Sequence, residues 1–327
     1  MIEVENLQKR FWIRQHHHGP GGALRNLVTR AGREVRAVDG ISFRVVAGEM
    51  VGYIGPNGAG KSTTIKMLTG ILVPSSGQVT VAGLVPWRQR RSLARRIGVV
   101  FGQRTQLWWD LPLIESLELL RHIYHVPAAR FAANLKSFRD LLDLDGFLDT
   151  PVRQLSLGQR MRGDLAAALL HDPEILYLDE PTIGLDVVAK QRIRDVLLCL
   201  NRERDLTVLL TTHDMTDIAR LCRRMMLIDH GRLLYDGAVA AIRDRFGVAR
   251  TLVVDLAEDE TLAGPLAIVP AEEVRADGPR RWLRFRRDEI TAAELIAAIS
   301  ARYRIRDLSI EEPEIEGIVR RIYQEGL

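Results

Sequence analysis

The sequence predicts an α/β protein in which helices wrap a parallel sheet, followed by a small α+β domain. The apolar run 50–54 ends in a glycine-rich turn, and a helical run over 62–68 follows it. Two further apolar runs of buried-strand length, 175–178 and 207–210, each come after a helical pattern. Such an alternation of helix and buried strand is typical of a parallel sheet covered on both faces.

The first residues carry a different strand signal. Residues 2–4 and 41–45 alternate apolar and polar side chains, as half-buried antiparallel strands do. Between them we predict an insertion over residues 12–36, with a His-His-His-Gly-Pro-Gly-Gly loop at 16–22 and a short amphipathic helix at 24–28. The triple histidine could hold a metal ion, but a flexible loop is the favoured interpretation.

After Asp236-Gly237 the pattern changes, which predicts a main domain over 1–240 and a C-terminal α+β domain over 241–327. Residues 252–256 and 282–285 have strand patterns.

Arginines gather on the second of these C-terminal strands, at 280, 281, 284, 286 and 287. They could meet anionic lipid or nucleic acid. We favour a solvated edge strand that its charges protect from unwanted pairing.

Composition narrows the class of protein. The 327 residues are 46% apolar and 27% charged, which excludes a disordered chain. The only cysteines, Cys199 and Cys222, exclude a disulfide framework and favour a reducing cytoplasm. No run of about 18 apolar residues and no signal-peptide core occurs, so we predict neither a membrane span nor secretion. The net charge is +4 and the basic residues are almost all arginine, which fits a GC-rich bacterial genome better than a nucleic-acid surface.

A phosphate-binding motif lies between the first buried strand and its helix. The pattern G-x-x-x-x-G-K-[ST] is satisfied, and the alternative, a glycine-rich turn that binds nothing, fits this strand-to-helix position poorly. Backbone N–H groups of such a loop surround phosphate, Lys61 supplies a point charge, and the Ser62 hydroxyl ligates Mg²⁺. The predicted nucleotide contacts are Gly55, Pro56, Asn57, Gly58, Ala59, Gly60, Lys61, Ser62 and Thr63.

Two carboxylates end the strand at 175–178. Asp179 is the predicted magnesium-side residue, and Glu180 is the candidate general base that takes a proton from the attacking water. A merely solvated acidic strand end is the alternative.

These motifs, with three others in order, resemble those of ATP-binding cassette (ABC) ATPases over roughly residues 1–240. Leu-Ser-Leu-Gly-Gln at 155–159 resembles the ABC signature, although Leu157 stands where the family usually has glycine. Gln103 resembles the Q-loop glutamine, His213 the switch histidine, and Asp186 the D-loop aspartate. The resemblance implies a P-loop NTPase fold of the ABC ATPase type: a parallel-sheet core, an antiparallel β subdomain and a helical signature subdomain.

The resemblance also implies how ATP and Mg²⁺ are bound. Ser156, Gly158 and Gln159 of one copy would complete the ATP site of a second copy in a homodimer, and Ser156 is in any case a plausible N-cap for a helix over 157–170. Gln103 would ligate magnesium on a mobile loop. Phe11 is the best match to the adenine-stacking aromatic and Trp12 the second, unless either belongs to the core.

His213 would hydrogen-bond the γ-phosphate and hold the attacking water, and a structural histidine at a strand end is the alternative. Asp186 would bridge the two copies, unless it is an ordinary turn residue.

Residues 97–103 and 107–112 resemble the ATPases of ABC-2-type exporters, in particular the viologen and multidrug branch. The resemblance implies an ATPase that energises export of a small molecule or drug through separate ABC-2-type permease subunits, at the cytoplasmic side of the bacterial inner membrane, with no nucleic acid. Trp108 and Trp109 would contribute a binding surface, or pack locally. The C-terminal domain would regulate or support the homodimer.

A soluble ABC ATPase that acts on nucleic acid or the ribosome is the alternative, and a nucleotide-binding regulator that does not hydrolyse ATP is the third candidate. The Asp179, Glu180 and His213 set speaks against the last.

Overall fold

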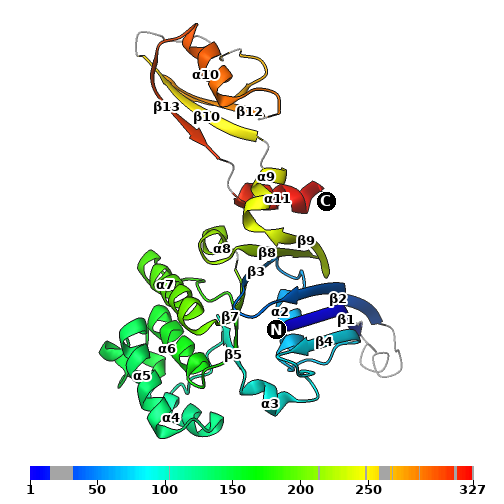
Figure 1. Ribbon diagram of the computed structural model, residues 1–327, viewed down its shortest axis with the longest axis vertical. Helices are drawn as coiled ribbons and strands as arrows, with labels where there is room; N and C mark the ends of the chain where they lie inside the picture. Colours follow the sequence, from blue (N-terminus) through cyan, green and yellow to red (C-terminus); the bar gives the residue numbers. More distant parts are fainter. Residues whose placement is uncertain are drawn as a thin grey trace, which may run out of the picture. The chain divides into compact units, whose positions relative to one another are not determined.

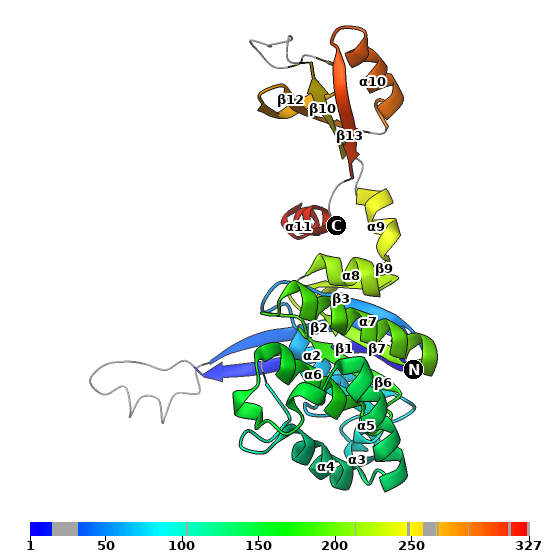
Figure 2. The same ribbon diagram turned by 90° about the vertical axis from the view of Figure 1, so that its left-hand side faces the viewer.

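The computed structural model describes residues 1–14, 32–102, 104–212, 214–246, 249–257, 266, 268–286, 288–312 and 315–325. Gln103, His213, the triple histidine and the helix expected at 24–28 lie outside these ranges. The chain divides into two compact units, Met1–Gly237 and Ala238–Leu327, which are described separately (Figure 1 and Figure 2). Within the described ranges, no helix has both the length and the apolar character needed to cross a bilayer.

Nine strands begin in the described part of the first unit. They are β1 (Ile2–Arg14), β2 (Gly32–Val45), β3 (Met50–Ile54), β4 (Ser76–Val81), β5 (Ile97–Phe101), β6 (Ile175–Asp179), β7 (Thr207–Thr211), β8 (Arg224–Asp229) and β9 (Arg232–Ala238). Its helices are α2 (Lys61–Leu68), α3 (Arg90–Ala94), α4 (Leu113–Tyr124), α5 (Ala128–Leu142), α6 (Leu157–Leu169), α7 (Val187–Arg204) and α8 (Met215–Leu221), with 3₁₀ turns at Asp145–Phe147 and Val152–Gln154.

The predicted parallel sheet is confirmed. Six strands lie in the order β5-β6-β7-β3-β8-β9, and each pair from β5 to β8 is parallel. Every residue of β3 and of β7 is buried, as expected of apolar strands covered on both faces. Because these strands are parallel, their carboxyl ends lie along one edge of the sheet, and this is where ligands bind in open α/β folds.

The predicted antiparallel strands are also present, but they are longer than expected. In the second sheet, of order β2-β1-β4, Trp12 lies opposite Glu34 and Arg14 opposite Gly32. The insertion predicted over 12–36 is therefore wrong at both ends, because its first and last residues continue the hairpin. Gly32 permits this pairing, since a Cβ there would lie 2.4 Å from Trp12 Nε1.

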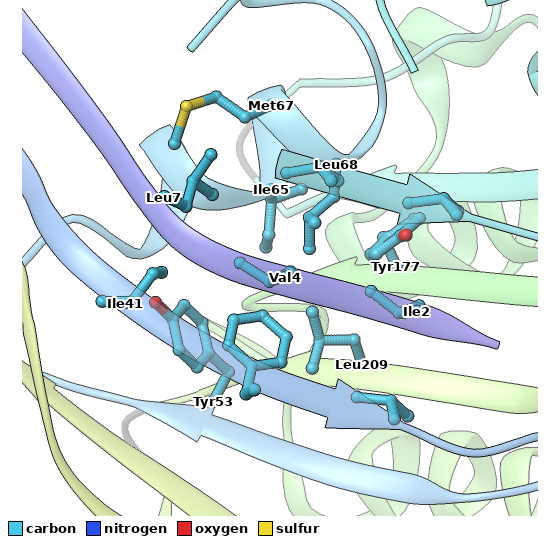
Figure 3. Packing of buried hydrophobic residues seen from close by; sticks show 14 of the residues in the cluster. Ile2, Val4, Leu7, Ile41, Tyr53, Ile65, Met67, Leu68, Tyr177 and Leu209 are labelled. Atoms are coloured by element: carbon cyan, nitrogen blue, oxygen red, sulfur yellow. The ribbon is translucent and has the colours of Figure 1, made fainter. Parts of the chain in front are cut away.

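The main hydrophobic core joins the two sheets and covers one face of α2. Apolar side chains of β1 and β2 meet Tyr53 of β3 and Tyr177 of β6, as Figure 3 shows. Ile65 and Leu68 of α2 are fully buried in the same cluster. A hydrogen bond of 3.2 Å between the Tyr53 and Thr64 hydroxyl groups adds a buried link between β3 and α2. The first turn of α2 is thereby held at the carboxyl end of β3.

A helical layer of α4, α5 and α6 packs beside the parallel sheet, as the expected helical subdomain requires (Figure 1). Small residues allow close approach, since a Cβ at Gly163 of α6 would lie 2.9 Å from Leu113 Cδ1 of α4. Helix α6 begins at a capping box: Gln159 N donates to Ser156 Oγ over 3.2 Å, and Ser156 N donates to Gln159 Oε1 over 2.9 Å. The expected N-cap is confirmed.

The second unit is the expected small α+β fold with an antiparallel sheet of order β11-β12-β10-β13. Helix α10 covers one face of this sheet through Leu295 and Ile299. Its elements are α9 (Val239–Phe246), β10 (Ala249–Leu256), β11 (Glu272–Asp277), β12 (Arg280–Arg286), α10 (Ala292–Ser300), β13 (Ile305–Glu311) and α11 (Ile315–Glu325).

The arginine-rich strand β12 is not an edge strand, so that expectation was wrong. Strands β11 and β10 flank it, and two of its arginines meet acidic partners on these neighbours. Arg280 Nη2 donates to Asp255 Oδ2 over 2.8 Å, and the buried Arg281 lies 3.8 Å from Glu273. The charges of Arg280 and Arg281 are therefore matched within the sheet, because the strand order places acidic residues beside them, and the local sequence does not show that order.

Candidate functional site

The turn between β3 and α2 forms a small cleft. Gly58 and Gly60 have positive φ values of 82° and 111°, which suit glycine. A Cβ at Gly60 would also lie 2.4 Å from Ala37 O of β2, so the turn is tight as well as twisted. The cleft has a volume of about 160 Å³ and is lined by Ala37, Pro56, Asn57, Gly58, Gly60, Lys61, Ser62, Thr63 and Glu180.

Lys61 is buried at the start of α2 and folds back over this turn. Its Nζ donates to Gly55 O over 2.5 Å and to Pro56 O over 3.1 Å. Burial lowers the pKa of Lys61, and the nearby carboxylates of Glu180 and Asp179 oppose that shift. The ammonium group thus lies between the cradle and the acidic end of β6, as a phosphate-binding lysine must.

An oxygen-only donor set lies beside it. Ser62 Oγ donates to Asp179 Oδ2 over 3.0 Å, and Thr211 Oγ1 donates to Asp179 Oδ1 over 2.6 Å. A hydroxyl and a carboxylate within hydrogen-bond distance are ligands that Mg²⁺ prefers. The residues present therefore fit magnesium. Thr211 was missed by sequence reasoning, although it directly precedes Thr212-His213 at the end of a buried strand.

Glu180 is held in a left-handed conformation with φ of 58°, which is rare for a residue other than glycine. Such a conformation costs on the order of 1–3 kcal/mol and persists only where neighbours enforce it. Here the Glu180 N–H donates to Thr211 O over 2.9 Å and to Thr211 Oγ1 over 3.2 Å. These two hydrogen bonds therefore hold Glu180 at the end of β6, where it lines the cleft.

Gly102 supports Glu180 from the other side. Its N–H donates to Asp179 O over 2.7 Å, and a Cβ at this position would lie 2.2 Å from Glu180 O. Gly102 was also missed, and the available signal was a glycine at a strand end directly before Gln103. Only a residue without a side chain allows β5 to approach the Asp179-Glu180 backbone so closely.

A second, larger cleft of about 530 Å³ adjoins the first and shares Asn57, Ser62 and Glu180 with it. The other residues that line it are Lys66, Ile71, Phe101, Gly102, Arg104, Asp179 and Ile183. The acidic strand end thus opens both onto the phosphate cradle and onto a partly apolar surface beside β5.

The signature residues are absent from the linings of both clefts. Ser156, Gly158 and Gln159 lie at the start of α6 instead, where a Cβ at Gly158 would lie 3.5 Å from Ala189 Cβ and 4.0 Å from Leu185 Cδ2. Within one chain, the structure does not bring these three residues to the phosphate cradle.

The aromatic candidates Phe11 and Trp12 lie on β1 and are 39% and 60% exposed, so the core alternative was wrong for both. Lys9 Nζ lies 5.2 Å from the centroid of the Phe11 ring. Neither aromatic lines the described clefts, but Ala37 of the paired strand β2 does.

Asp186 acts as the N-cap of α7, where its Oδ1 accepts from Ala189 N over 2.8 Å. Trp108 and Trp109 are 38% and 51% exposed, and the Arg160 guanidinium lies 5.6 Å from the Trp109 ring centroid. Both tryptophan side chains are thus partly exposed to solvent and partly packed against the protein.

Comparison with known sequences matches residues 38–183 to the ABC transporter family. The chain is 40% identical over 209 residues to the Nod factor export ATP-binding protein I of Paraburkholderia xenovorans, covering 64% of this chain and 68% of that protein. It is 36% identical over 248 residues to the daunorubicin resistance ATP-binding protein DrrA3 of Streptomyces coeruleorubidus, covering 76% and 78%. It is 33% identical over 208 residues to the ABC transporter ATP-binding protein NatA of Bacillus subtilis, covering 64% of this chain and 84% of that protein.

Solved structures give the same result for the fold. A dimeric post-hydrolysis state of the ATP-binding cassette MJ0796 bound to ADP and Pi aligns with a TM-score of 0.61 at 25% identity, covering 73% of this chain and 99% of that one. The ATP binding subunit of an ABC transporter aligns with a TM-score of 0.63 at 26% identity, covering 75% and 93%.

Proposed function

The chain belongs to the ABC transporter family as an ATP-binding subunit, and on that premise we propose that it hydrolyses ATP to energise export through separate ABC-2-type permease subunits. The observation that carries the proposal is the cluster at the end of β6. There Ser62 Oγ and Asp179 Oδ2 are 3.0 Å apart beside Lys61, and the backbone of Glu180 is held in a strained conformation at the same cleft.

The chemistry of hydrolysis follows from these residues. The glycine-rich turn and Lys61 bind the phosphates, and Ser62 and Asp179 would hold Mg²⁺, which neutralises charge on the phosphate oxygens when bound. Glu180 accepts the proton of the attacking water as general base. Gln103 as a magnesium ligand, and His213 as a γ-phosphate contact, complete the proposal from the family pattern.

Two copies form the complete site in this proposal. The start of α6 carries Ser156, Gly158 and Gln159, and it lines neither cleft of its own chain, so it is available to ATP bound by a second copy. A related cassette has been solved as a dimer, which supports the same assembly. Shifting a pair from mostly open to mostly closed needs about 5.5 kcal/mol of differential ATP affinity. In this assembly Asp186 would bridge the copies, Phe11 would stack on adenine, and the second unit would regulate or support the dimer.

The export assignment rests on the relatives. Their names include Nod factor export and daunorubicin resistance, at 40% and 36% identity. By that analogy the chain would lie at the cytoplasmic face of the bacterial inner membrane, attached through its permease, and the exported compound would be a small molecule that the permease selects. Co-expression with a candidate permease tests this: the chain should sediment with membranes only when the permease is present. Sedimentation with ribosomes instead would contradict an exporter role.

The catalytic assignment is tested by Glu180→Gln. This variant should bind ATP with Mg²⁺, lose phosphate release, and elute as a stable dimer in size-exclusion chromatography with ATP. Glu118→Gln on the exposed face of α4 is the matched control and should behave as the wild type. Normal hydrolysis by Glu180→Gln would show that another group is the base.

A further inference from the structure

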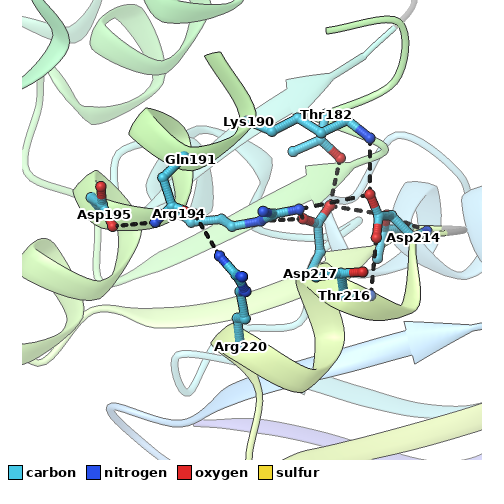
Figure 4. A network of polar contacts seen from close by, with 10 residues as sticks. Thr182, Lys190, Gln191, Arg194, Asp195, Asp214, Thr216, Asp217 and Arg220 are labelled. Atoms are coloured by element: carbon cyan, nitrogen blue, oxygen red, sulfur yellow. Dashed lines mark hydrogen bonds and ion pairs between the residues drawn. The ribbon is translucent and has the colours of Figure 1, made fainter. Parts of the chain in front are cut away.

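A buried polar network lies behind the site, between α7 and α8. Asp217 of α8 is 0% exposed and Arg194 of α7 only 6%. Arg194 Nε donates to Asp217 Oδ1 over 2.5 Å, and Arg194 Nη2 also contacts the same oxygen. Figure 4 shows the Arg194 side chain pointing from α7 toward Asp217. An ion pair this deep requires further hydrogen bonds to be tolerated.

Two threonines supply those bonds. Thr182 Oγ1 donates to Asp217 Oδ2 over 2.6 Å, and Thr212 Oγ1 contacts the same oxygen at 3.4 Å. Thr182 is two residues after Glu180. Thr212 directly follows Thr211, which holds the Glu180 N–H, and directly precedes residue 213 in the sequence. One buried carboxylate therefore joins the loop after β6 to the loop after β7.

A second tie runs parallel to the first. Lys190 Nζ donates to Asp214 Oδ2 over 2.9 Å, and Arg194 Nη2 lies 3.7 Å from the same oxygen. Lys190 and Arg194 are four residues apart and so share one face of α7. Helix α7 starts at its N-cap Asp186, the residue proposed to meet the second copy. The same helix is thus attached to both loops.

We propose that Thr182, Arg194, Thr212 and Asp217, the Asp217 clamp, are positioning residues for ATP hydrolysis. They touch neither cleft, and they act by fixing the loop that follows Glu180 against the loop on either side of position 213. The proposal rests on the function proposed above. Replacing a buried ion pair by apolar residues is often neutral for stability, so stability alone is a weak reason to bury these four polar groups. Holding these two loops in one geometry would be a sufficient reason to bury them, because misplacement of a catalytic group by about 1 Å can cost 100-fold in rate.

The test removes one hydroxyl and leaves the ion pair in place. Thr182→Val keeps the shape of the side chain but cannot donate to Asp217. We expect kcat for ATP hydrolysis by the full chain to fall about tenfold, which corresponds to about 1.4 kcal/mol, while the dissociation constant of a fluorescent ATP analogue stays unchanged. Thr182→Ser, which restores the donor, should recover kcat.

Thr207→Val is the matched control. Thr207 is also fully buried, and its Oγ1 accepts the Gly48 N–H over 3.0 Å at the amino end of β7, away from the site. Each Val variant loses one hydrogen bond, so Tm should fall in both, by about 3 °C in Thr207→Val and by more in Thr182→Val, whose lost bond is to a buried carboxylate. Only Thr182→Val should lower kcat.

The proposal would be overturned if Thr182→Val lost Tm but kept its kcat. It would also be overturned if kcat fell as much in Thr207→Val as in Thr182→Val. A fall in kcat that Thr182→Ser does not recover would also count against it. Failure of the proposed function is recognised separately, because wild-type chain would then release no phosphate from ATP.

Discussion

Gly102→Ala tests the contact that holds Glu180 in place. A Cβ at residue 102 would lie 2.2 Å from Glu180 O, and ordinary Cβ contacts do not fall below 3.0 Å, so the two backbones must separate by about 0.8 Å. At the residue proposed as general base, a shift of this size should cost on the order of 100-fold in rate. We expect kcat to fall by about that factor. ATP affinity should change much less, because the cradle at 55–63 belongs to a separate segment.

The stability cost needs its own control. Overpacking of this kind costs about 1–3 kcal/mol. Gly98→Ala, on the same strand β5, creates a comparable clash, since its Cβ would lie 2.4 Å from Ala168 O. Gly146→Ala is the neutral control, because nothing lies within 4 Å of its Cβ position.

Phosphate release, analogue binding and thermal unfolding are measured for all three variants. Gly98→Ala should be destabilised with a near-normal kcat, and Gly146→Ala should match the wild type. The reasoning fails if folded Gly102→Ala keeps kcat within twofold of the wild type, or if Gly98→Ala loses as much.

Three further outcomes are expected. Lys61→Ala should abolish ATP binding in calorimetry while circular dichroism stays unchanged, and retained micromolar affinity would contradict the assigned role of the ammonium that now contacts Gly55 O. Ser156→Ala removes the cap of α6, so thermal unfolding should show a loss of about 1 kcal/mol, and ATP should no longer hold Glu180→Gln as a dimer in size-exclusion chromatography. Burial raises the pKa of Asp164 to about 6 against opposing hydrogen bonds from Gln106 N and Thr105 Oγ1. Because the folded state binds that proton more tightly than the unfolded state, the contribution of Asp164 to the free energy of unfolding falls by about 3 kcal/mol as pH rises from about 4 to about 6. Urea titrations across this pH range should show the loss in the wild type and not in Asp164→Asn.

The cradle and the acidic strand end could be predicted from sequence because each is a local pattern with a local mechanism. The turn at 55–60 needs backbone conformations that favour glycine, and the sequence has glycine at those positions. Ser156 and Gln159 form a capping box within four consecutive residues. The parallel strands were equally accessible, since their apolar runs report burial on both faces.

What escaped prediction depends on contacts between distant residues. Gly102 matters only because β5 lies against the backbone of Glu180, and Thr211 only because β7 lies on the other side of β6. The position of β12 inside its sheet, and the length of the β1–β2 hairpin, are likewise set by strand partners. Periodicity reports how each strand is buried, but not which strand pairs with it.

The capping box of α6 also affects which hydrogen-bonding groups the start of this helix presents to a ligand. Ser156 Oγ accepts the Gln159 N–H with one of its two lone pairs, and its own hydrogen can be donated to another group. The unsatisfied amides of the first turn point the same way. In the proposed dimer, this helix end would offer hydrogen-bond donors to the terminal phosphate of ATP, and those bonds would be lost once hydrolysis releases that group.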